Sequence, residues 1–186
     1  MQQLFETDKA DLPDDIDAMW ASPLCTHDSR ARTAAKTPRD LEGSDKLVAK
    51  VLEIASWFSA PYCSENPDGL LKTGPVVESI PMRMVDYCQN KDERWEPRYR
   101  KRTCIWKSTD WMPERGLCNP FNCPCCGADG KHLDQAQRAG KRGAGKGNTL
   151  AQLYAMPPAL LASFLDWYLL GLFAPPLYML ARPEYD

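Results

Sequence analysis

The pattern of apolar and polar positions predicts a strand at residues 16–22, a mostly apolar run that ends abruptly at Pro23. From residue 44 apolar residues recur at helical spacing until Pro61, and Ser44 or Asp45 is the expected N-cap. Three later strands are expected, at residues 62–67, 82–88 and 103–107. This order predicts an α/β sheet that carries its functional groups on the loops after strand ends.

A long apolar segment closes the sequence. Residues 157–181 contain one charged residue, Asp166, and are long enough to form a spanning helix. Four prolines and the central aspartate oppose a span, because both are costly in lipid. The apolar residues Leu153, Met156, Leu160, Leu161, Phe164 and Leu165 instead fit a helix that packs on a core. We expect the packed helix and keep the membrane span as the alternative.

Composition and charge narrow the class of protein. The net charge of −2 and the pI near 5.8 exclude a uniformly basic nucleic-acid coat, so any contact with nucleic acid must use local patches. The eight cysteines follow no basic and apolar leader of the secretory type, and we interpret them as reduced thiols of an intracellular, non-secreted protein.

Residues 116–148 differ in composition from the rest, being rich in Cys, Gly, Lys and Asn and poor in apolar residues. Their spacing, Cys118-x4-Cys123-x-Cys125-Cys126-x5-His132, is typical of a structural zinc site. The expected ligands are Cys118, Cys123, Cys126 and His132, with Cys125 as a substitute. Zinc binding would supply the folding energy that apolar burial cannot. The alternative is a set of reduced loop thiols beside an unrelated histidine.

Three further groups of residues suggest chemistry. Cys25 stands in a polar loop just after the first strand, as a nucleophile requires, although a lone cysteine near His27 is the plainer interpretation. Glu65 follows at the end of the next strand, either as a general acid or as part of a turn. Residues 99–103 are basic, and form either a solvated edge or a clamp on phosphate and base.

In this order the three groups resemble the motifs of the DNA cytosine-5 methyltransferases, most closely the phage-like and de novo-like forms. The resemblance covers about residues 12–165. Trp-Ala-Ser-Pro-Leu-Cys-Thr at 20–26 resembles the Ser-Pro-Pro-Cys nucleophile loop, and Ser-Glu-Asn-Pro at 64–67 resembles the Glu-Asn-Val motif. Arg100-Lys101-Arg102 resembles the Gln-x-Arg-x-Arg motif. The implied fold is a partial class I methyltransferase sheet, Rossmann-like, with a zinc-knuckle-like insert and a C-terminal apolar helix.

The resemblance implies covalent chemistry on a cytosine flipped out of DNA. Cys25 would add to carbon 6, Glu65 would hydrogen-bond or protonate the ring nitrogen, and carbon 5 would attack the methyl group of S-adenosylmethionine. By the same resemblance, Arg102 would hold the base carbonyl, Arg100 would brace the loop and Asn66 would orient the end of the Glu65 strand. Pro23 would contact the cofactor. The basic residues of the insert, expected against the DNA backbone or in a flexible linker, are Arg138, Lys141, Arg142 and Lys146.

Two departures from the family pattern matter. Leu24 replaces the proline before the nucleophile, and no Gly-x-Gly precedes Asp17 where the family binds its cofactor. We therefore expect a truncated catalytic domain at 1–115, a recognition insert at 116–148 and a helical apolar segment at 149–186. The chain alone is expected to be inactive until a second polypeptide supplies the cofactor-binding unit.

Two other functions stay open from the sequence alone. A degenerate methyltransferase remnant could serve as a structural or interaction subunit, anchored in a membrane by residues 157–181. A zinc-dependent DNA-binding module without catalysis would bind DNA with a steep dependence on salt. Action on DNA implies the nucleus, and an organelle is the alternative compartment.

Overall fold

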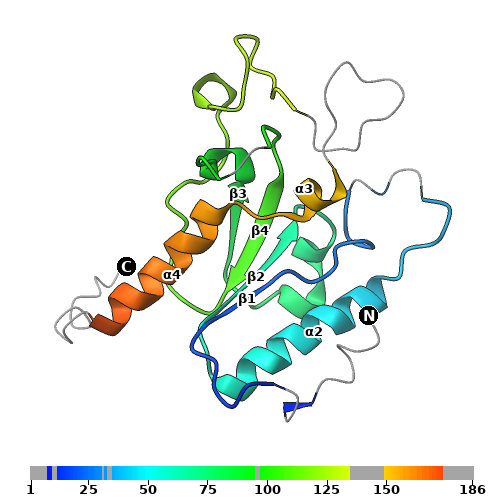
Figure 1. The fold of residues 1–186 in the computed structure, drawn as a ribbon. Helices are drawn as coiled ribbons and strands as arrows, with labels where there is room; N and C mark the ends of the chain where they lie inside the picture. Colours follow the sequence, from blue (N-terminus) through cyan, green and yellow to red (C-terminus); the bar gives the residue numbers. More distant parts are fainter. Residues whose placement is uncertain are drawn as a thin grey trace, which may run out of the picture.

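The structure is a computed structural model that describes residues 8–9, 12–30, 32, 35–94, 97–134 and 149–173. Its centre is a mixed sheet of four strands in the order β1-β2-β4-β3 (Figure 1). These strands are β1 (Met19–Ala21), β2 (Tyr62–Pro67), β3 (Met82–Asp86) and β4 (Arg102–Lys107). β1 pairs in parallel with β2, whereas β4 lies antiparallel to both β2 and β3. The predicted mixture of helices and strands around one sheet is confirmed.

The strand boundaries depart from prediction at two places. β1 has three residues rather than the seven expected from the apolar run, and all three are half-buried. β3 ends at Asp86, and Tyr87–Asn90 form a 3-10 turn where continued strand was expected. Cys88 therefore lies in the turn that directly follows the end of β3.

The helix between β1 and β2, α2 (Leu41–Phe58), begins earlier than predicted. Its N-cap is Asp40, whose carboxylate accepts a hydrogen bond from the Gly43 amide at 2.8 Å. Ser44, expected as the cap, is buried and donates its hydroxyl to the Asp28 carboxylate. The helix ends at Phe58, and its C-cap Ser59 adopts the left-handed conformation with φ of 51°.

Each face of the sheet has its own apolar core. On one face, Val48 and Leu52 of α2 pack with Cys104 and Trp106 of β4. On the other face, Cys63 and Ile105 pack with Leu160 and Phe164 of the C-terminal segment. Because side chains alternate along a strand, residues of odd number on β2 and β4 face the C-terminal segment.

Two helices form that C-terminal segment, α3 (Leu150–Tyr154) and α4 (Pro158–Phe173). The predicted packing is confirmed for Leu160 and Phe164, each 1% exposed, and is wrong for Leu165, which is 49% exposed. The Phe164 ring makes edge contacts with Trp20 and Trp111, at centroid distances of 5.7 and 5.4 Å. The first half of α4 is thus part of the core.

The second half of α4 is apolar and exposed, with Leu169, Leu170 and Leu172 on its surface. Residues 151–172 are long and apolar enough to cross a membrane, and 17% of that window is buried. Length and composition alone are weak support for a span, since packed core helices meet the same criterion. Residues 174–181 of the predicted span lie outside the described residues.

Candidate active site and adjacent cysteine cluster

The loop after β1 holds Cys25 in a hydrogen-bonded turn. The Cys25 carbonyl oxygen accepts hydrogen bonds from the amides of Asp28 and Ser29, at 3.1 and 2.9 Å. The Asn66 side-chain amide, at the end of β2, donates to the carbonyl oxygen of Pro23 at 3.0 Å. The neighbouring strand therefore fixes the loop just before the thiol; the role predicted for Asn66, orienting the end of the Glu65 strand, stays a prediction.

A second anchor fixes the other side of this loop. Asp28 is 2% exposed, and its carbonyl oxygen accepts the Leu70 amide at 2.9 Å. A Cβ atom at Gly69 would lie 2.4 Å from that oxygen, so only glycine permits this approach. The Nδ1 atom of the neighbouring His27 is engaged elsewhere: it accepts the Asp40 amide at 2.7 Å, at the start of α2. His27 therefore has a structural partner.

Glu65 lies in β2 and is only 4% exposed. The hydroxyl of Tyr87 donates a hydrogen bond to Glu65 Oε2 at 2.9 Å. Burial, followed by the nearby Glu65 carboxylate, raises the pKa of Tyr87 well above its ordinary value, so the phenol keeps its proton. The Glu65 carboxylate is therefore oriented by a permanent donor from the turn after β3.

Lys101 is the cation on the same side of the sheet. Its Nζ lies 4.8 Å from the centre of the Tyr87 ring, and Lys101 lines a cavity together with Cys25. Burial raises the pKa of the Cys25 thiol, the Lys101 charge opposes that rise, and the Glu65 carboxylate adds to it. These effects show that Cys25, Glu65 and Lys101 share one electrostatic environment.

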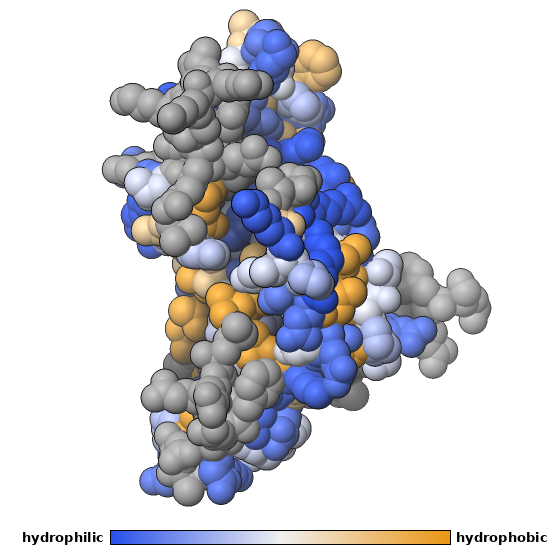
Figure 2. Space-filling view, turned by 90° about the vertical axis from the view of Figure 1, so that its right-hand side faces the viewer, coloured by the Kyte–Doolittle hydropathy of each residue, from blue (hydrophilic) through white to orange (hydrophobic). Residues whose placement is uncertain are grey.

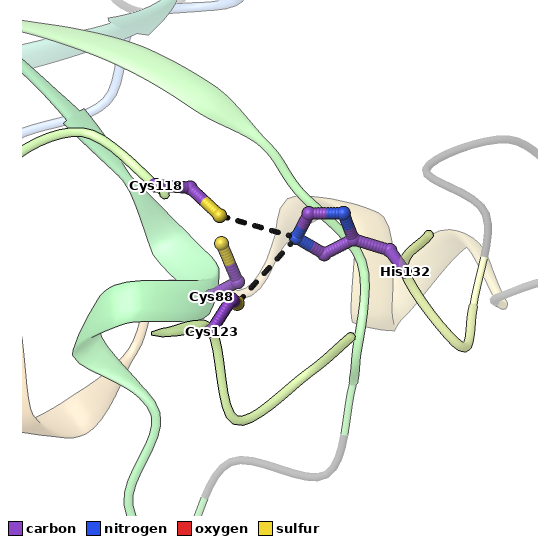
Figure 3. A group of neighbouring side chains, drawn as sticks. All are labelled: Cys88, Cys118, Cys123 and His132. Atoms are coloured by element: carbon purple, nitrogen blue, oxygen red, sulfur yellow. Dashed lines mark hydrogen bonds between the residues drawn. The ribbon is translucent and has the colours of Figure 1, made fainter. Parts of the chain in front are cut away.

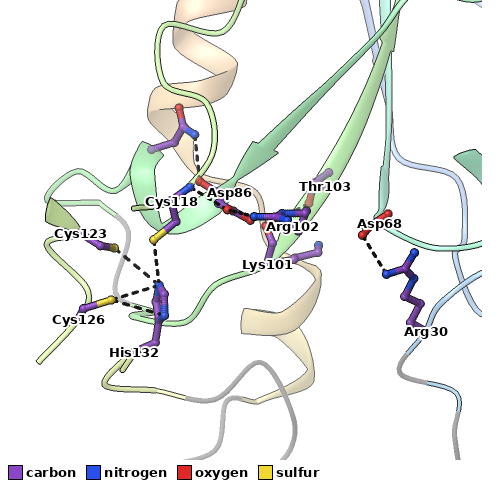
Figure 4. A network of polar contacts seen from close by, with 11 residues as sticks. Arg30, Asp68, Asp86, Lys101, Arg102, Thr103, Cys118, Cys123, Cys126 and His132 are labelled. Carbon is purple, nitrogen blue, oxygen red and sulfur yellow. Dashed lines mark hydrogen bonds and ion pairs between the residues drawn. The ribbon is translucent and has the colours of Figure 1, made fainter. Parts of the chain in front are cut away.

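Arg102 has a different partner. Its Nε and Nη2 donate to the two carboxylate oxygens of Asp86 at 3.2 and 2.9 Å, and Asp86 is fully buried (Figure 4). Glu65 is opposite Ile105 in the sheet register, so strand alternation directs Arg102 to the other face. The predicted contact of Arg102 with the base therefore competes with a buried ion pair.

The cavity beside Cys25 has a volume of about 600 Å³, within the range of small-ligand sites. Its lining includes the predicted residues Cys25, Arg100 and Arg102, together with Tyr99 and Lys101. Hydrophilic side chains predominate over much of the described part of the face shown in Figure 2. Cationic and aromatic groups around such a cavity suit a nucleotide, because they offer both charge pairing and stacking.

A second cluster lies at the end of β3. The possible ligand atoms of Cys88, Cys118, Cys123 and His132 all lie within 4.8 Å of one another (Figure 3). Three of these were expected from the sequence, whereas Cys88 was missed. Its only sequence signal is a cysteine just after a strand, far along the chain from the other ligands.

The remaining cysteines of the Cys-rich segment occupy two further places. Cys126 Sγ lies 3.6 Å from Nδ1 and 3.7 Å from Nε2 of His132, beside the ring. Cys125, the expected substitute ligand, is fully buried and directs its thiol to the Cys88 carbonyl oxygen at 3.7 Å. The Cys118 amide donates to Asp86 Oδ2 at 2.8 Å, which joins this cluster to the partner of Arg102.

The predicted DNA-facing residues Arg138, Lys141, Arg142 and Lys146 lie outside the described residues. Asp134 is the last described residue before them, and its Oδ2 accepts a hydrogen bond from the Arg98 amide at 2.8 Å.

Comparison with known proteins gives a clear relative. The chain is 31% identical over 173 residues to a protein of Frog virus 3 (isolate Goorha) described as a probable DNA (cytosine-5)-methyltransferase. The match covers 83% of this chain and 76% of the viral protein. No family model matches the sequence, and no solved structure matches it.

Proposed function

The chain belongs to the DNA (cytosine-5)-methyltransferase family, and from this premise we propose that it transfers a methyl group to carbon 5 of a cytosine in DNA. The observation that carries the proposal is that Cys25 lines a cationic cavity after β1, while the buried Glu65 on the neighbouring strand β2 acts electrostatically on its thiol. We also propose that the described sheet is the base-binding part of a class I methyltransferase sheet, within residues 1–115, and that residues 116–148 face the DNA.

The proposed reaction begins with the thiolate of Cys25. Its electron pair forms a bond to carbon 6 of the flipped cytosine, and the displaced ring electrons move towards the ring nitrogen and carbon 5. For this step Glu65 must carry a proton on Oε1, the oxygen that does not accept from Tyr87, and it donates that proton to the ring nitrogen. After methyl transfer a water molecule accepts the carbon 5 proton, and the electrons of the broken bond re-form the carbon 5–carbon 6 double bond and expel the Cys25 thiolate. The ring nitrogen returns its proton to Glu65.

S-adenosylmethionine would supply the electrophilic methyl group. Pro23 and Leu24 are suited to the methyl end of this cofactor, because Leu24 is 47% exposed and gives an apolar surface directly beside Cys25. Asn66 holds the Pro23 carbonyl oxygen, which keeps this surface in register with β2. The need for a second polypeptide to hold the rest of the cofactor stays a prediction, as do the membrane anchor and the compartment.

Two cations have distinct proposed roles. Lys101 stabilises the Cys25 thiolate and approaches the base, because it lies on the Glu65 side of the sheet. Arg102, paired with Asp86, acts as a positioning residue for the segment that carries Lys101. Arg100 lines the cavity, where it can brace the nucleophile loop or pair with a phosphate.

We propose zinc as the structural metal of the Cys-rich segment. Thiolates and imidazole are the ligands that zinc prefers, and Cys118, Cys123 and His132 are brought together as the sequence predicted. The segment has few apolar side chains of its own, so the metal would supply folding energy.

The proposal is tested by trapping the covalent intermediate. The purified chain is incubated with labelled S-adenosylmethionine and a duplex that carries 5-fluorocytosine, whose carbon 5 has no removable proton. With a cofactor-binding unit supplied as a separate polypeptide, we expect a labelled adduct with wild type, none with Cys25→Ser and much less with Glu65→Gln. An adduct that persists in Cys25→Ser would overturn the assignment of the nucleophile.

The absence of an adduct with wild type, even when a cofactor-binding unit is supplied as a separate polypeptide, would instead favour a non-catalytic member of the family. The exposed leucines of α4 support that second candidate, an interaction subunit, because they leave an apolar surface uncovered among the described residues. Its test is whether solubility depends on detergent only while residues 157–181 are present.

A further inference from the structure

We infer that one zinc ion is bound by Cys88, Cys118, Cys123 and His132, and that it fastens the Cys-rich segment to the end of β3. The inference goes beyond the proposed methyl transfer, because it would hold for an active or an inactive member of the family. It also differs from a self-contained zinc knuckle, since one ligand comes from the sheet itself.

The first argument is geometric. The four ligand atoms lie within 4.8 Å of one another, and His132 Nε2 is 3.6 Å from Cys118 Sγ and 3.7 Å from Cys123 Sγ. Ligand atoms of one tetrahedral zinc ion are separated by roughly 3.5 to 3.8 Å, given the usual zinc–sulfur and zinc–nitrogen bond lengths. The two distances from Nε2 match these separations, and the thiol groups and the imidazole in Figure 3 point toward one another.

The second argument concerns burial. Cys88 is fully buried and Cys123 is 7% exposed, in a small cluster made almost entirely of cysteines. A group of apolar side chains would explain such burial, but here the packed atoms are thiol sulfurs that face one another. A divalent cation at their centre would allow the thiols to lose their protons and would compensate the buried charge.

Cys126 is the competing fourth ligand, and its position argues against it. A metal bound to Nε2 lies on the side of the ring away from Nδ1, so a further ligand of that metal must be clearly farther from Nδ1 than from Nε2. Cys126 Sγ is nearly equidistant from the two nitrogens, at 3.6 and 3.7 Å. It therefore lies beside the imidazole rather than in front of Nε2.

A Cys88 ligand would connect the metal to residues that position Glu65 and Arg102. Cys88 belongs to the turn that also carries Tyr87, the hydrogen-bond donor to Glu65. Cys118, another ligand, donates its amide to the buried Asp86 that holds Arg102. One bound metal ion would thus hold both the turn that carries Tyr87 and the carboxylate of Asp86 in place.

The experiment measures metal content in the full chain. Wild type and single variants are purified without chelator, and zinc is determined by mass spectrometry of the elements. We expect about one zinc ion per chain in wild type and loss of most of it in Cys88→Ser. Cys125→Ser is the matched control, because Cys125 is equally buried and touches Cys88 but is not a ligand; it should keep the metal.

Cys126→Ser makes the test decisive even if Cys88→Ser fails to fold. Cys126 is half-buried, and its variant should keep about one zinc ion per chain. Loss of zinc from Cys126→Ser, or full retention by a folded Cys88→Ser, would overturn the inference. X-ray absorption at the zinc edge of wild type should show three sulfur ligands and one nitrogen ligand; four sulfur ligands would exclude His132.

Discussion

The reactivity of Cys25 depends on the balance between its burial and one nearby cation. Burial raises the pKa of the thiol from its ordinary value, and the Lys101 charge lowers it by stabilising the thiolate. At neutral pH the thiol form therefore predominates, and the thiolate fraction grows as pH rises. Removing the Lys101 charge takes away the stabilisation, so the pKa should move still higher.

We accordingly predict that Lys101→Met shifts the pH profile of Cys25 alkylation to higher pH and slows alkylation at pH 8 by several-fold. The measurement is the rate of iodoacetamide labelling of Cys25, followed by peptide mass spectrometry between pH 6 and 10. Lys72→Met is the matched control, because Lys72 is paired with Asp68 at 2.8 Å. Equal shifts in both variants would show a general charge effect and contradict a specific role for Lys101.

Tyr87 carries a second prediction at the level of one atom. In Tyr87→Phe the buried Glu65 carboxylate loses its donor, and the free energy of unfolding should fall by about 1.5 to 3 kcal/mol. The rate of adduct formation should fall at saturating DNA, because Glu65 is no longer held in one orientation. Urea unfolding and single-turnover assays measure the two effects, with Tyr62→Phe on β2 as control. Unchanged values in both assays would rule out the positioning role.

Among the elements, α4 divides into a core half and an exposed half. Phe164, 1% exposed, packs against Trp20 and Trp111, so Phe164→Ala should lower the free energy of unfolding by about 3 to 5 kcal/mol. Leu170 is 70% exposed, and Leu170→Ala should change it by less than about 0.5 kcal/mol. Urea titration of the two variants provides the comparison. A large loss from Leu170→Ala would mean that the exposed half is covered in solution.

The elements also show what sequence patterns can predict. The limits of β2 follow from the flanking Pro61 and the Asp68-Gly69 turn, and nearly all of β4 was predicted from its short central run of strand-forming residues. The start of α2 was missed because Asp40 and Ser44 are both good caps, and only the packing of Ser44 against Asp28 decides between them. Local sequence does not indicate the long-range contact between Ser44 and Asp28.

The site was predictable to the same extent. Cys25 and Glu65 were selected from their place at predicted strand ends, Asn66 was added by the family resemblance, and the catalytic roles of all three stay predictions. The pairing of Arg102 with the buried Asp86 depends on strand register, since β3 and β4 place the two residues opposite each other, and the order of motifs does not contain that long-range pairing. Cys88 reaches the other ligands because β3 pairs with β4. The spacing of cysteines within the insert does not contain this pairing, so Cys88 was missed.

For the whole molecule, the inferred metal and the nucleophile loop should respond differently to a chelator. The Cys25 loop is anchored by Asn66 and by the contact of Asp28 with Leu70, neither of which involves the cysteine cluster. The turn that carries Tyr87 and the carboxylate of Asp86 are instead adjacent to the proposed ligands. Metal removal should therefore disturb the Glu65 side of the site and spare the thiol.

We predict that a zinc chelator lowers the thermal midpoint and slows adduct formation on 5-fluorocytosine DNA by at least about tenfold, a loss of roughly 1.4 kcal/mol in transition-state stabilisation. Alkylation of Cys25 at pH 8 should change by less than about twofold, because its anchors remain in place. Re-addition of zinc should restore the adduct rate. Asp86→Asn, which keeps the metal ligands but weakens the contact with Arg102, should slow adduct formation without loss of zinc. If the chelator accelerates Cys25 alkylation as strongly as it slows adduct formation, the metal supports the entire fold, and the separation of the two halves of the site is wrong.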